Sequence, residues 1–419
     1  MNILHLNTYD IGGAGKASYR LHQNLIEGGI NSQMLVLTKR NPNNQVFSTR
    51  RHDLRFTLQN IITNSWFRLR TNKIYYFQNI RNSLITEIKQ LTCKIYQQPD
   101  VIVAHWISNF VTVEQLYQLS IETGAPLVWY LLDMAPLTGG CHYAWNCTGY
   151  MNQCGNCPAL YSNNQYDLSY KNWKMKHDLI QKMNITIVPA TSWLAEQAKK
   201  ATIFKDKKIN QIMISIDPNV FKPIPKKNAR GKLGIAWTQK IIFFGTQSKE
   251  TKRKGIFYLM ESLNIFANSP DFDKNKILII TAGDISLIKS LLENQFNYHS
   301  LGILSNDKML ATAYQAADLF ICPSIEDSGP MMINESIMCG TPVVSFEMGV
   351  AIDLVHTGKT GYRAKLKDSA DLAQGIKYIM NLKPEQAKDM SKNCRDLAIK
   401  KCSPEIQLEA FNSLFESLL

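Results

Sequence analysis

The stretch of residues 317–346 constrains the fold of this chain more than any other part of the sequence. Residues 319–322 form an apolar run with the length of a buried strand. A turn at residues 327–330 (Asp-Ser-Gly-Pro) opens a helical segment, which Gly340 ends. Residues 343–346 form a second apolar strand. A strand–turn–helix–strand unit of this kind predicts a parallel α/β sheet, whose ligands bind beyond the carboxyl ends of its strands.

Two carboxylates mark that edge of the predicted sheet. Asp327 lies in the turn, and Glu335 follows eight positions later on the helix. Acidic pairs on helices are usually part of a solvated face. With the flanking Pro-Ser and Cys-Gly-Thr-Pro segments, however, the pair resembles the paired-acid motif of retaining GT-B glycosyltransferases of family four. The resemblance implies that Glu335 binds the ribose hydroxyls of a nucleotide-sugar. It also implies that Asp327, or the adjacent Glu326, lies near the sugar and phosphates, with Ser328 and Gly329 beside them.

The same resemblance implies an α/β fold of the GT-B type, in which two Rossmann-like domains face each other across a cleft. We expect an acceptor-binding domain over residues 1–215 and a nucleotide-sugar-binding domain over residues 216–395. A Pro-rich segment near residues 216–223 reads as the linker between them. By family precedent, residues 396–419 form a helix that returns to the first domain.

A second loop of the C-terminal half carries positive charge. A strand predicted at residues 240–245 ends at Gly245, and the loop after it ends with Arg253, Lys254 and a glycine. Two cations beside flexible backbone at a helix N-terminus suit a diphosphate, although such clusters are commonly solvated turns. The resemblance implies that these cations neutralise the departing nucleoside diphosphate, so that catalysis requires no metal cofactor.

The N-terminal half begins with a strand at residues 3–7 and a glycine-rich loop. Gly12, Gly13 and Gly15 let backbone N–H groups approach a phosphate, or simply form a tight turn before a helix from Tyr19. Family members carry a similar loop facing the donor phosphates and the acceptor.

Two later strands end in polar residues that we expect on the acceptor side. His105 follows the strand at residues 101–104, and Asp133 follows the strand at residues 126–132. Many family members have His-Asp at the second place, whereas this chain has Leu132 before Asp133. Either His105 or His142 supplies the missing polar group, or a different sugar is recognised.

A cysteine cluster follows within a short span. The sequence places Cys141, His142, Cys147, Cys154 and Cys157 together, the last two as a Cys-Gly-Asn-Cys motif. Four thiols and one imidazole predict a structural zinc site, with free thiols and disulfides as alternatives. The cluster resembles a subgroup of glycosyltransferases similar to those of colanic-acid-type exopolysaccharide synthesis.

Charge gives one further expectation. The chain has a net charge of +13, and residues 39–94 interleave many Lys and Arg with aromatic residues. This pattern is typical of a membrane surface, a nucleic-acid patch or an exposed basic face. We favour contact with an anionic membrane surface and expect no nucleic acid as a partner. Without a leader or a long apolar run, the sequence predicts a cytoplasmic protein, peripheral on the inner face of the membrane.

Together these features predict a retaining, hexosyltransferase-type enzyme of cell-surface polysaccharide synthesis. Its partners are a UDP- or GDP-sugar donor and a glycan or lipid-linked acceptor. Three alternatives stay open: a nucleotide-sugar epimerase of the GT-B fold, a basic nucleic-acid-binding protein, and a catalytically silent scaffold.

Overall fold

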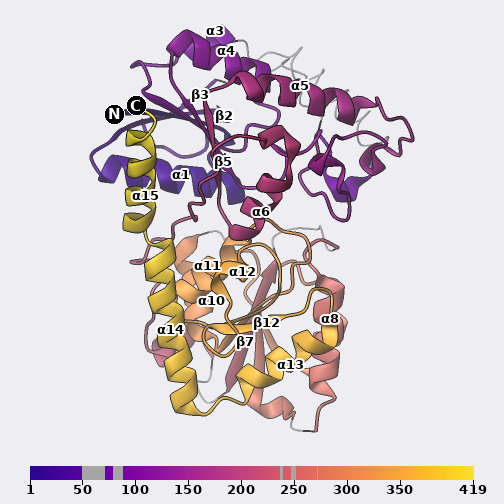
Figure 1. Cartoon of the computed structure of the whole chain (residues 1–419). Coiled ribbons are helices and arrows are strands. Elements are labelled where there is room, and N and C mark those ends of the chain that lie inside the picture. The colour runs from indigo at the N-terminus through magenta and orange to yellow at the C-terminus, as the bar shows by residue number, and fades with distance from the viewer. Residues whose placement is uncertain (50–70, 79–87, 236–238, 247–251, 271, 305) are drawn as a thin grey trace. The chain divides into compact units, whose positions relative to one another are not determined.

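The computed structural model (Figure 1) describes the chain except for residues 50–70, 79–87, 236–238, 247–251, 271 and 305. It divides into two compact units. Unit 1 comprises Met1–Ser215 and Pro404–Leu419, and unit 2 comprises Ile216–Ser403.

Unit 1 is built on a parallel sheet with the strand order β3-β2-β1-β4-β5-β6. The central strands are buried over most of their length because helices cover both faces of such a sheet. The strands are β1 (Asn2–Tyr9), β2 (Asn31–Thr38), β3 (Val46–Ser48), β4 (Val101–Ala104), β5 (Leu127–Leu131) and β6 (Ile185–Pro189). The helices are α1 (Gly12–Glu27), α3 (Ile88–Thr92), α4 (Val113–Thr123), α5 (Leu168–Lys182), α6 (Ser192–Lys200) and α15 (Pro404–Glu416).

The last helix, α15, belongs to unit 1 because its buried face packs on α1 (Figure 1). Gln407 is almost fully buried in this contact. Its side-chain amide donates to the Met213 carbonyl at 2.8 Å, and its Oε1 accepts from Ser215 at 2.8 Å. These bonds tie the C-terminus to the end of the first 215 residues.

Unit 2 repeats the topology of unit 1, with the strand order β12-β11-β10-β7-β8-β9 and parallel pairing throughout. The strands are β7 (Lys240–Thr246), β8 (Ile277–Gly283), β9 (Asn297–Ser300), β10 (Leu319–Cys322), β11 (Val343–Phe346) and β12 (Gly361–Ala364). The helices are α7 (Lys226–Lys232), α8 (Ile256–Ala267), α9 (Lys289–Gln295), α10 (Asp307–Ala316), α11 (Met331–Met338), α12 (Ala351–Leu354), α13 (Ser369–Met380) and α14 (Pro384–Cys402).

Each sheet has one place where the direction of winding reverses. In unit 1 it lies between β1 and β4, and in unit 2 between β7 and β10. Loops leave these neighbouring strands toward opposite faces, so a crevice opens beyond their carboxyl ends, where ligands of such sheets bind. The α/β prediction is therefore confirmed, and the sheet order identifies the edge at which each site is to be sought.

Two predicted boundaries differ from the structure. Helix α1 begins at Gly12, so the glycine-rich segment is the first turn of the helix and no separate loop precedes Tyr19. The segment predicted to begin at residue 396 starts inside α14, which runs unbroken to Cys402. Helical periodicity continues across residue 396, and the chain leaves unit 2 only at Ser403 and Pro404.

Candidate functional site

At the reversal point of unit 2, the loop after β7 meets the loop after β10. Asp327 is nearly buried, and its Oδ2 accepts from Arg253 Nη1 at 2.8 Å and from Lys254 Nζ at 2.6 Å. The sequence predicted all three residues as parts of one donor site but did not predict that they pair. The pairing leaves two cations against one carboxylate, an excess of one positive charge.

The ionic state of Asp327 follows from this pairing. Burial alone would raise the pKa of its carboxyl group, but the charges of Lys254 and Arg253 outweigh burial and lower the pKa. The N–H of Gly329 also donates to Asp327 Oδ1 at 3.2 Å. Asp327 is therefore a carboxylate that orients both cations.

The two loops lie this close because residue 255 is glycine. Gly255 has a φ of +69°, and a Cβ there would lie 1.8 Å from the carbonyl oxygen of Pro323. The Arg253 carbonyl accepts from the N–H of Ile325 at 3.0 Å, and Arg253 Nη1 donates to the Glu326 carbonyl at 3.3 Å. A glycine thus permits the backbone contact that brings Arg253 and Lys254 to Asp327.

Glu335, the second predicted acid, lies on α11 behind this loop and is 2% exposed. Its Oε2 lies 3.4 Å from the hydroxyl of Tyr314 on α10. Burial, followed by the charge of Glu335, raises the pKa of Tyr314 well above its usual range, so the phenol keeps its proton. Gly245, near the end of β7, lies close to α11, since a Cβ at residue 245 would be 3.4 Å from Met332 Cε.

The corresponding edge of unit 1 carries the glycine-rich segment. Gly12 and Gly13 are exposed in the first turn of α1, and Gly15 is buried. A Cβ at Gly15 would lie 2.8 Å from the carbonyl oxygen of Tyr9, so β1 and α1 approach as only glycine allows. Asp10 between them accepts from the backbone N–H of Arg40 at 2.8 Å. The segment is therefore the first turn of α1, held close to the end of β1.

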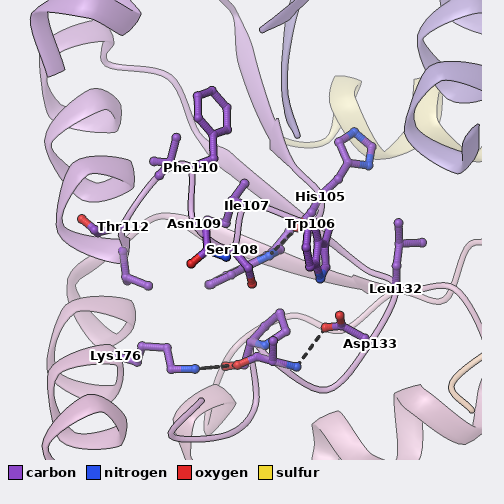
Figure 2. Close-up of a pocket in the computed structure, with 15 residues that line it drawn as sticks. His105, Trp106, Ile107, Ser108, Asn109, Phe110, Thr112, Leu132, Asp133 and Lys176 are labelled. Carbon is purple, nitrogen blue, oxygen red and sulfur yellow. Dashed lines mark hydrogen bonds between the residues drawn. The ribbon is translucent and has the colours of Figure 1, made fainter. Parts of the chain in front are cut away.

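Beside it, a pocket opens after β4 and β5 (Figure 2). It is lined by residues 105–113 together with Trp129, Leu132, Asp133, Ala135, Pro136 and Lys176. Lys176, on α5, is buried and donates from Nζ to the Ala135 carbonyl at 2.6 Å. Burial lowers the pKa of Lys176 to about 8, although the Coulombic effect of the nearby Cys154, Cys141 and Asp133 acts to raise it. Asp133, a predicted acceptor-side residue, lies on this pocket.

The ring of His105 does not face this pocket. Figure 2 shows it pointing away from Asp133 and Lys176. Its Nε2 lies 2.9 Å from Nδ1 of the buried His5, whose ring also meets the ring of His22. Burial lowers the pKa of His105 to about 3 and that of His22 to about 4. His105 is thus part of a buried cluster of neutral imidazoles and not a group presented to an acceptor.

The sequence offered two roles for His142, a polar group beside Asp133 and a zinc ligand beside the cysteines. The structure places His142 beside Asp133. Its Nδ1 is 2.5 Å from Asp133 Oδ2, and its Nε2 is 3.4 Å from Ser108 Oγ. The ring also packs against Tyr76 and Trp106. These contacts direct His142 away from the thiols, so the five-residue ligand set is corrected to four cysteines at most.

Those four cysteines line a separate small cavity. Backbone N–H groups face three of the sulfurs: Gly139 donates to Cys154 Sγ at 3.2 Å, Gly149 to Cys147, and Ala159 and Leu160 to Cys157. The thiol of Cys141 contacts Cys157, and this contact lowers the pKa of Cys157 to about 7. All nine cysteines are free thiols. Over the described ranges, no three His, Cys, Asp or Glu side chains form a group that could hold a metal ion.

The basic, aromatic stretch at residues 39–94 lies partly outside the described residues, including Trp66 and Phe67. Of its described aromatics, Phe77 is buried against Cys157 and Ala159, and Tyr75 packs beside it. Phe77 therefore stabilises the cysteine segment. No helix in the part of the chain that the structure describes is long and apolar enough to cross a membrane.

Sequence reasoning missed the partners that complete both sites. Ser108, Lys176 and Tyr314 carried no motif of their own. Lys176 had one usable signal, since it lies on the apolar face of α5 with Trp173 and Ile180. A lysine on an apolar face is rarely buried unless its charge has a partner.

Most of unit 2 lies within a match to a known protein family. Residues 225–397 match the model of the family described as glycosyl transferases group 1. D-inositol 3-phosphate glycosyltransferase of Geodermatophilus obscurus is 25% identical over 174 residues, 39% of this chain and 38% of that protein. N-acetyl-alpha-D-glucosaminyl L-malate synthase of Bacillus anthracis is 20% identical over 51% of this chain and 55% of that protein. The matches thus span well under two thirds of these relatives.

Solved structures match over the whole length. HepE from Anabaena, crystallised with UDP and glucose, aligns over 100% of both chains with a TM-score of 0.63 and 16% identity. Sucrose-phosphate synthase from Thermosynechococcus elongatus aligns over 100% of this chain and 99% of its own, with a TM-score of 0.68 and 15% identity. The chain therefore has the GT-B fold of glycosyltransferases, and its residues 225–397 match glycosyl transferases group 1.

Proposed function

We propose that this protein is a glycosyltransferase that moves a sugar from a UDP- or GDP-sugar to a glycan or lipid-linked saccharide, in cell-surface polysaccharide synthesis. The observation that carries the proposal is the cluster of Arg253, Lys254 and Asp327 beside the buried Glu335, at the reversal point of the unit 2 sheet. This cluster lies within the matched residues 225–397. HepE, a structural neighbour, has been crystallised with UDP-glucose.

The charges of the cluster suit a departing diphosphate. Asp327 holds the two cations in place before the donor arrives, so little reorganisation is needed when negative charge develops on the leaving group. The excess positive charge of the cluster favours the diphosphate further. Glu335, which is buried on α11, accepts hydrogen bonds from the ribose hydroxyl groups of the donor. We infer transfer with retention from the resemblance of the acid pair to retaining enzymes, with same-face attack assisted by the leaving phosphate.

Glu335→Gln is expected to raise the donor KM or Kd about 10- to 100-fold, because a neutral amide replaces a charged acceptor of hydroxyl groups. The measurement is a screen of UDP- and GDP-sugars by calorimetry, followed by product analysis of transfer. Acceptors are membrane extracts, inositol phosphate and malate, and product NMR reports the anomeric configuration. Glu293→Gln, at a half-exposed acid on α9, is the matched control.

Unchanged donor affinity in Glu335→Gln, with wild-type binding established, would remove the assignment of Glu335. A sugar nucleotide converted without any acceptor would instead indicate an epimerase.

We also propose that the enzyme meets its lipid-linked acceptor at an anionic membrane surface, as a peripheral protein. The support is the excess of bases at residues 39–94. The protein is expected to float with liposomes containing acidic phospholipid and to stay unbound with neutral ones, the bound fraction falling as salt rises. Equal flotation with both liposome types would contradict an electrostatic surface.

We further propose a structural zinc ion held by Cys141, Cys147, Cys154 and Cys157. The support is their shared cavity, the N–H groups that face three of the sulfurs, and the buried Lys176 as a counter-charge. The thiol side chains would have to rotate to converge, since in the described residues they do not form a ligand group. Catalysis itself requires no metal in this proposal.

Elemental analysis of unchelated protein is expected to find about one zinc per chain. Cys154→Ser should lose the metal and destabilise unit 1, whereas Cys93→Ser, at an exposed thiol, should retain it. Zinc-free protein in which all four thiols react rapidly would leave the cluster as ordinary free thiols.

A further inference from the structure

Glu335, the acid that binds the donor ribose in the proposed function, has a buried phenol beside it. The hydroxyl group of Tyr314, on α10, lies 3.4 Å from Glu335 Oε2. Tyr314 is fully buried, and Glu335 is 2% exposed. Away from water, a carboxylate depends on the groups that donate to it, and their positions set its orientation. The position of Tyr314 therefore bears on how Glu335 presents its oxygens to a ligand.

Toward Glu335, Tyr314 acts as a hydrogen-bond donor. Burial, followed by the charge of Glu335, raises the pKa of Tyr314 well above its usual range, so the phenol is protonated at neutral pH. An ionised carboxylate has no proton to donate and can only accept. The direction of the bond is thus fixed, from the phenol to Oε2.

The ring of Tyr314 is held by aromatic neighbours on three sides. It meets Phe243 of β7 and Phe320 of β10 edge-on, at 5.2 and 5.1 Å between centroids, and it is tilted against Phe221 at 6.4 Å. The Tyr314 carbonyl accepts from Thr341 Oγ1 at 2.7 Å. The phenol therefore has little freedom to move, and it loses little entropy when a ligand reaches its partner.

The helix that carries Glu335 is also held. Ser336 Oγ donates to the Thr341 carbonyl at 2.9 Å, and Arg395 Nη1 donates to the carbonyl of Met338, the last residue of α11, at 2.7 Å. With the backbones of α10 and α11 fixed, the side-chain torsions of Glu335 are set by the groups around its carboxylate. Tyr314 is among these groups, on the side of Oε2.

A fixed carboxylate can distinguish a ribose from a 2′-deoxyribose. The 2′- and 3′-hydroxyl groups lie on adjacent carbons, so a carboxylate in the right orientation accepts from both. Each carboxylate oxygen has two lone pairs, so the oxygen held by Tyr314 can still accept from the ribose. A 2′-deoxyribose leaves buried negative charge without its donor, which costs more than the missing bond alone. This penalty would shrink if the carboxylate could turn to other partners.

We propose that Tyr314 is a positioning residue that holds the Glu335 carboxylate toward the 2′-hydroxyl group of the donor, so that unit 2 selects ribonucleotide-linked sugars over sugars linked to a 2′-deoxyribonucleotide. This inference rests on the proposed function, because it concerns the donor of that reaction. Tyr314 acts through Glu335 and takes no part in a covalent step.

The test compares the binding of UDP and 2′-deoxy-UDP, and of GDP and 2′-deoxy-GDP, to the full chain by calorimetry. The wild type is expected to bind its ribonucleotide about 10- to 100-fold more tightly than the deoxy form, the effect of one hydrogen bond to a charged group. Tyr314→Phe removes one oxygen atom and keeps the ring. It should lower this ratio about 3- to 10-fold, because the carboxylate is then free to turn.

Tyr362→Phe is the matched control. Tyr362, on the edge strand β12 of the same sheet, donates to Asp371 Oδ1 at 2.6 Å. This variant also removes one oxygen atom and one bond from a phenol to a carboxylate, but away from the reversal point of the sheet. It should destabilise unit 2 and leave the ratio of the two Kd values unchanged. A merely structural role of Tyr314 predicts the same result for both variants.

A double-mutant cycle separates the two residues. In a Glu335→Gln background, Tyr314→Phe should not change the ratio further, since the phenol acts through the carboxylate. If the wild type discriminates but Tyr314→Phe keeps the full ratio, the inference is wrong and the proposed function stands. Equal binding of both nucleotides by the wild type, which needs no variant, would also overturn it. If neither UDP nor GDP binds, the proposed function fails and the inference fails with it.

Discussion

Gly255→Ala is expected to destabilise unit 2 by about 3–5 kcal/mol and to abolish measurable UDP binding. Residue 255 has a φ of +69°, which a side chain disfavours, and the new Cβ would lie 1.8 Å from the Pro323 carbonyl oxygen. The nearest atoms, the carbonyl oxygen and carbon of Pro323, belong to the backbone. No side-chain rotation can therefore relieve the overlap. The loops must separate, and the bonds from Arg253 and Lys254 to Asp327 are lost with them.

Gly358→Ala is the matched control for this prediction. Gly358 also has a positive φ, +80°, but its added Cβ would meet nothing closer than the Tyr378 hydroxyl at 3.7 Å. Gly358→Ala should therefore lower the free energy of unfolding only by the penalty for a side chain at positive φ, about 1–2 kcal/mol. Amide hydrogen exchange in β7 and β10 measures the loss of stability within unit 2. Equal destabilisation by the two variants would mean that the contact with Pro323 is not needed.

Acidification is expected to unfold unit 1 well above the pH at which its carboxylates titrate. His5, His22 and His105 are fully buried and neutral, and burial lowers the pKa of His22 to about 4 and of His105 to about 3. The unfolded chain binds protons at these residues near pH 6.5 and the folded unit does not. Stability is therefore unaffected above pH 6.5 and falls below it.

The size of the effect follows from linkage. Each such histidine removes about 1.4 kcal/mol per pH unit below 6.5, so His22 and His105 together remove about 5 kcal/mol by about pH 4.5. Ordinary aspartate titrates below this window, near pH 3.9. The window thus reports the histidines.

Tryptophan fluorescence follows unit 1 selectively, because six of the seven tryptophans lie within residues 1–215. Urea unfolding between pH 7 and 4.5 should show a steep loss of stability. The slope of the unfolding free energy against pH reports the number of protons taken up on unfolding. His22→Gln should reduce that number by about one. His299→Gln, at an exposed histidine on β9, should leave it unchanged. A flat profile from pH 6.5 to 4.5 would show that the cluster is protonated in the folded state.

Several parts of the fold were predictable because they are local. The apolar run at residues 319–322, the turn after it and the helix carrying Glu335 follow from strand and helix periodicity within one short segment. The glycine at 255 likewise marked a turn. Such patterns predict elements, and the order of elements predicts a parallel α/β sheet.

The error at Gly12 also has a local cause. Glycine runs favour turns in isolation, so the helix was expected from Tyr19. In the structure the glycines are accommodated in the first turn of α1, because Gly15 packs against the backbone of β1. Tertiary packing overrode propensity there.

The amino-acid sequence by itself determined two α/β halves, their strand–loop–helix units and the acids and cations that a nucleotide-sugar needs. Only the tertiary structure decided which of these meet: Asp327 with Arg253 and Lys254, Gln407 with Ser215, and His142 with Asp133 instead of the thiols. The physical reason is that such contacts depend on strand order and on where loops leave the sheet. Periodicity along the chain carries no record of either, since contacts across a sheet join residues far apart in sequence.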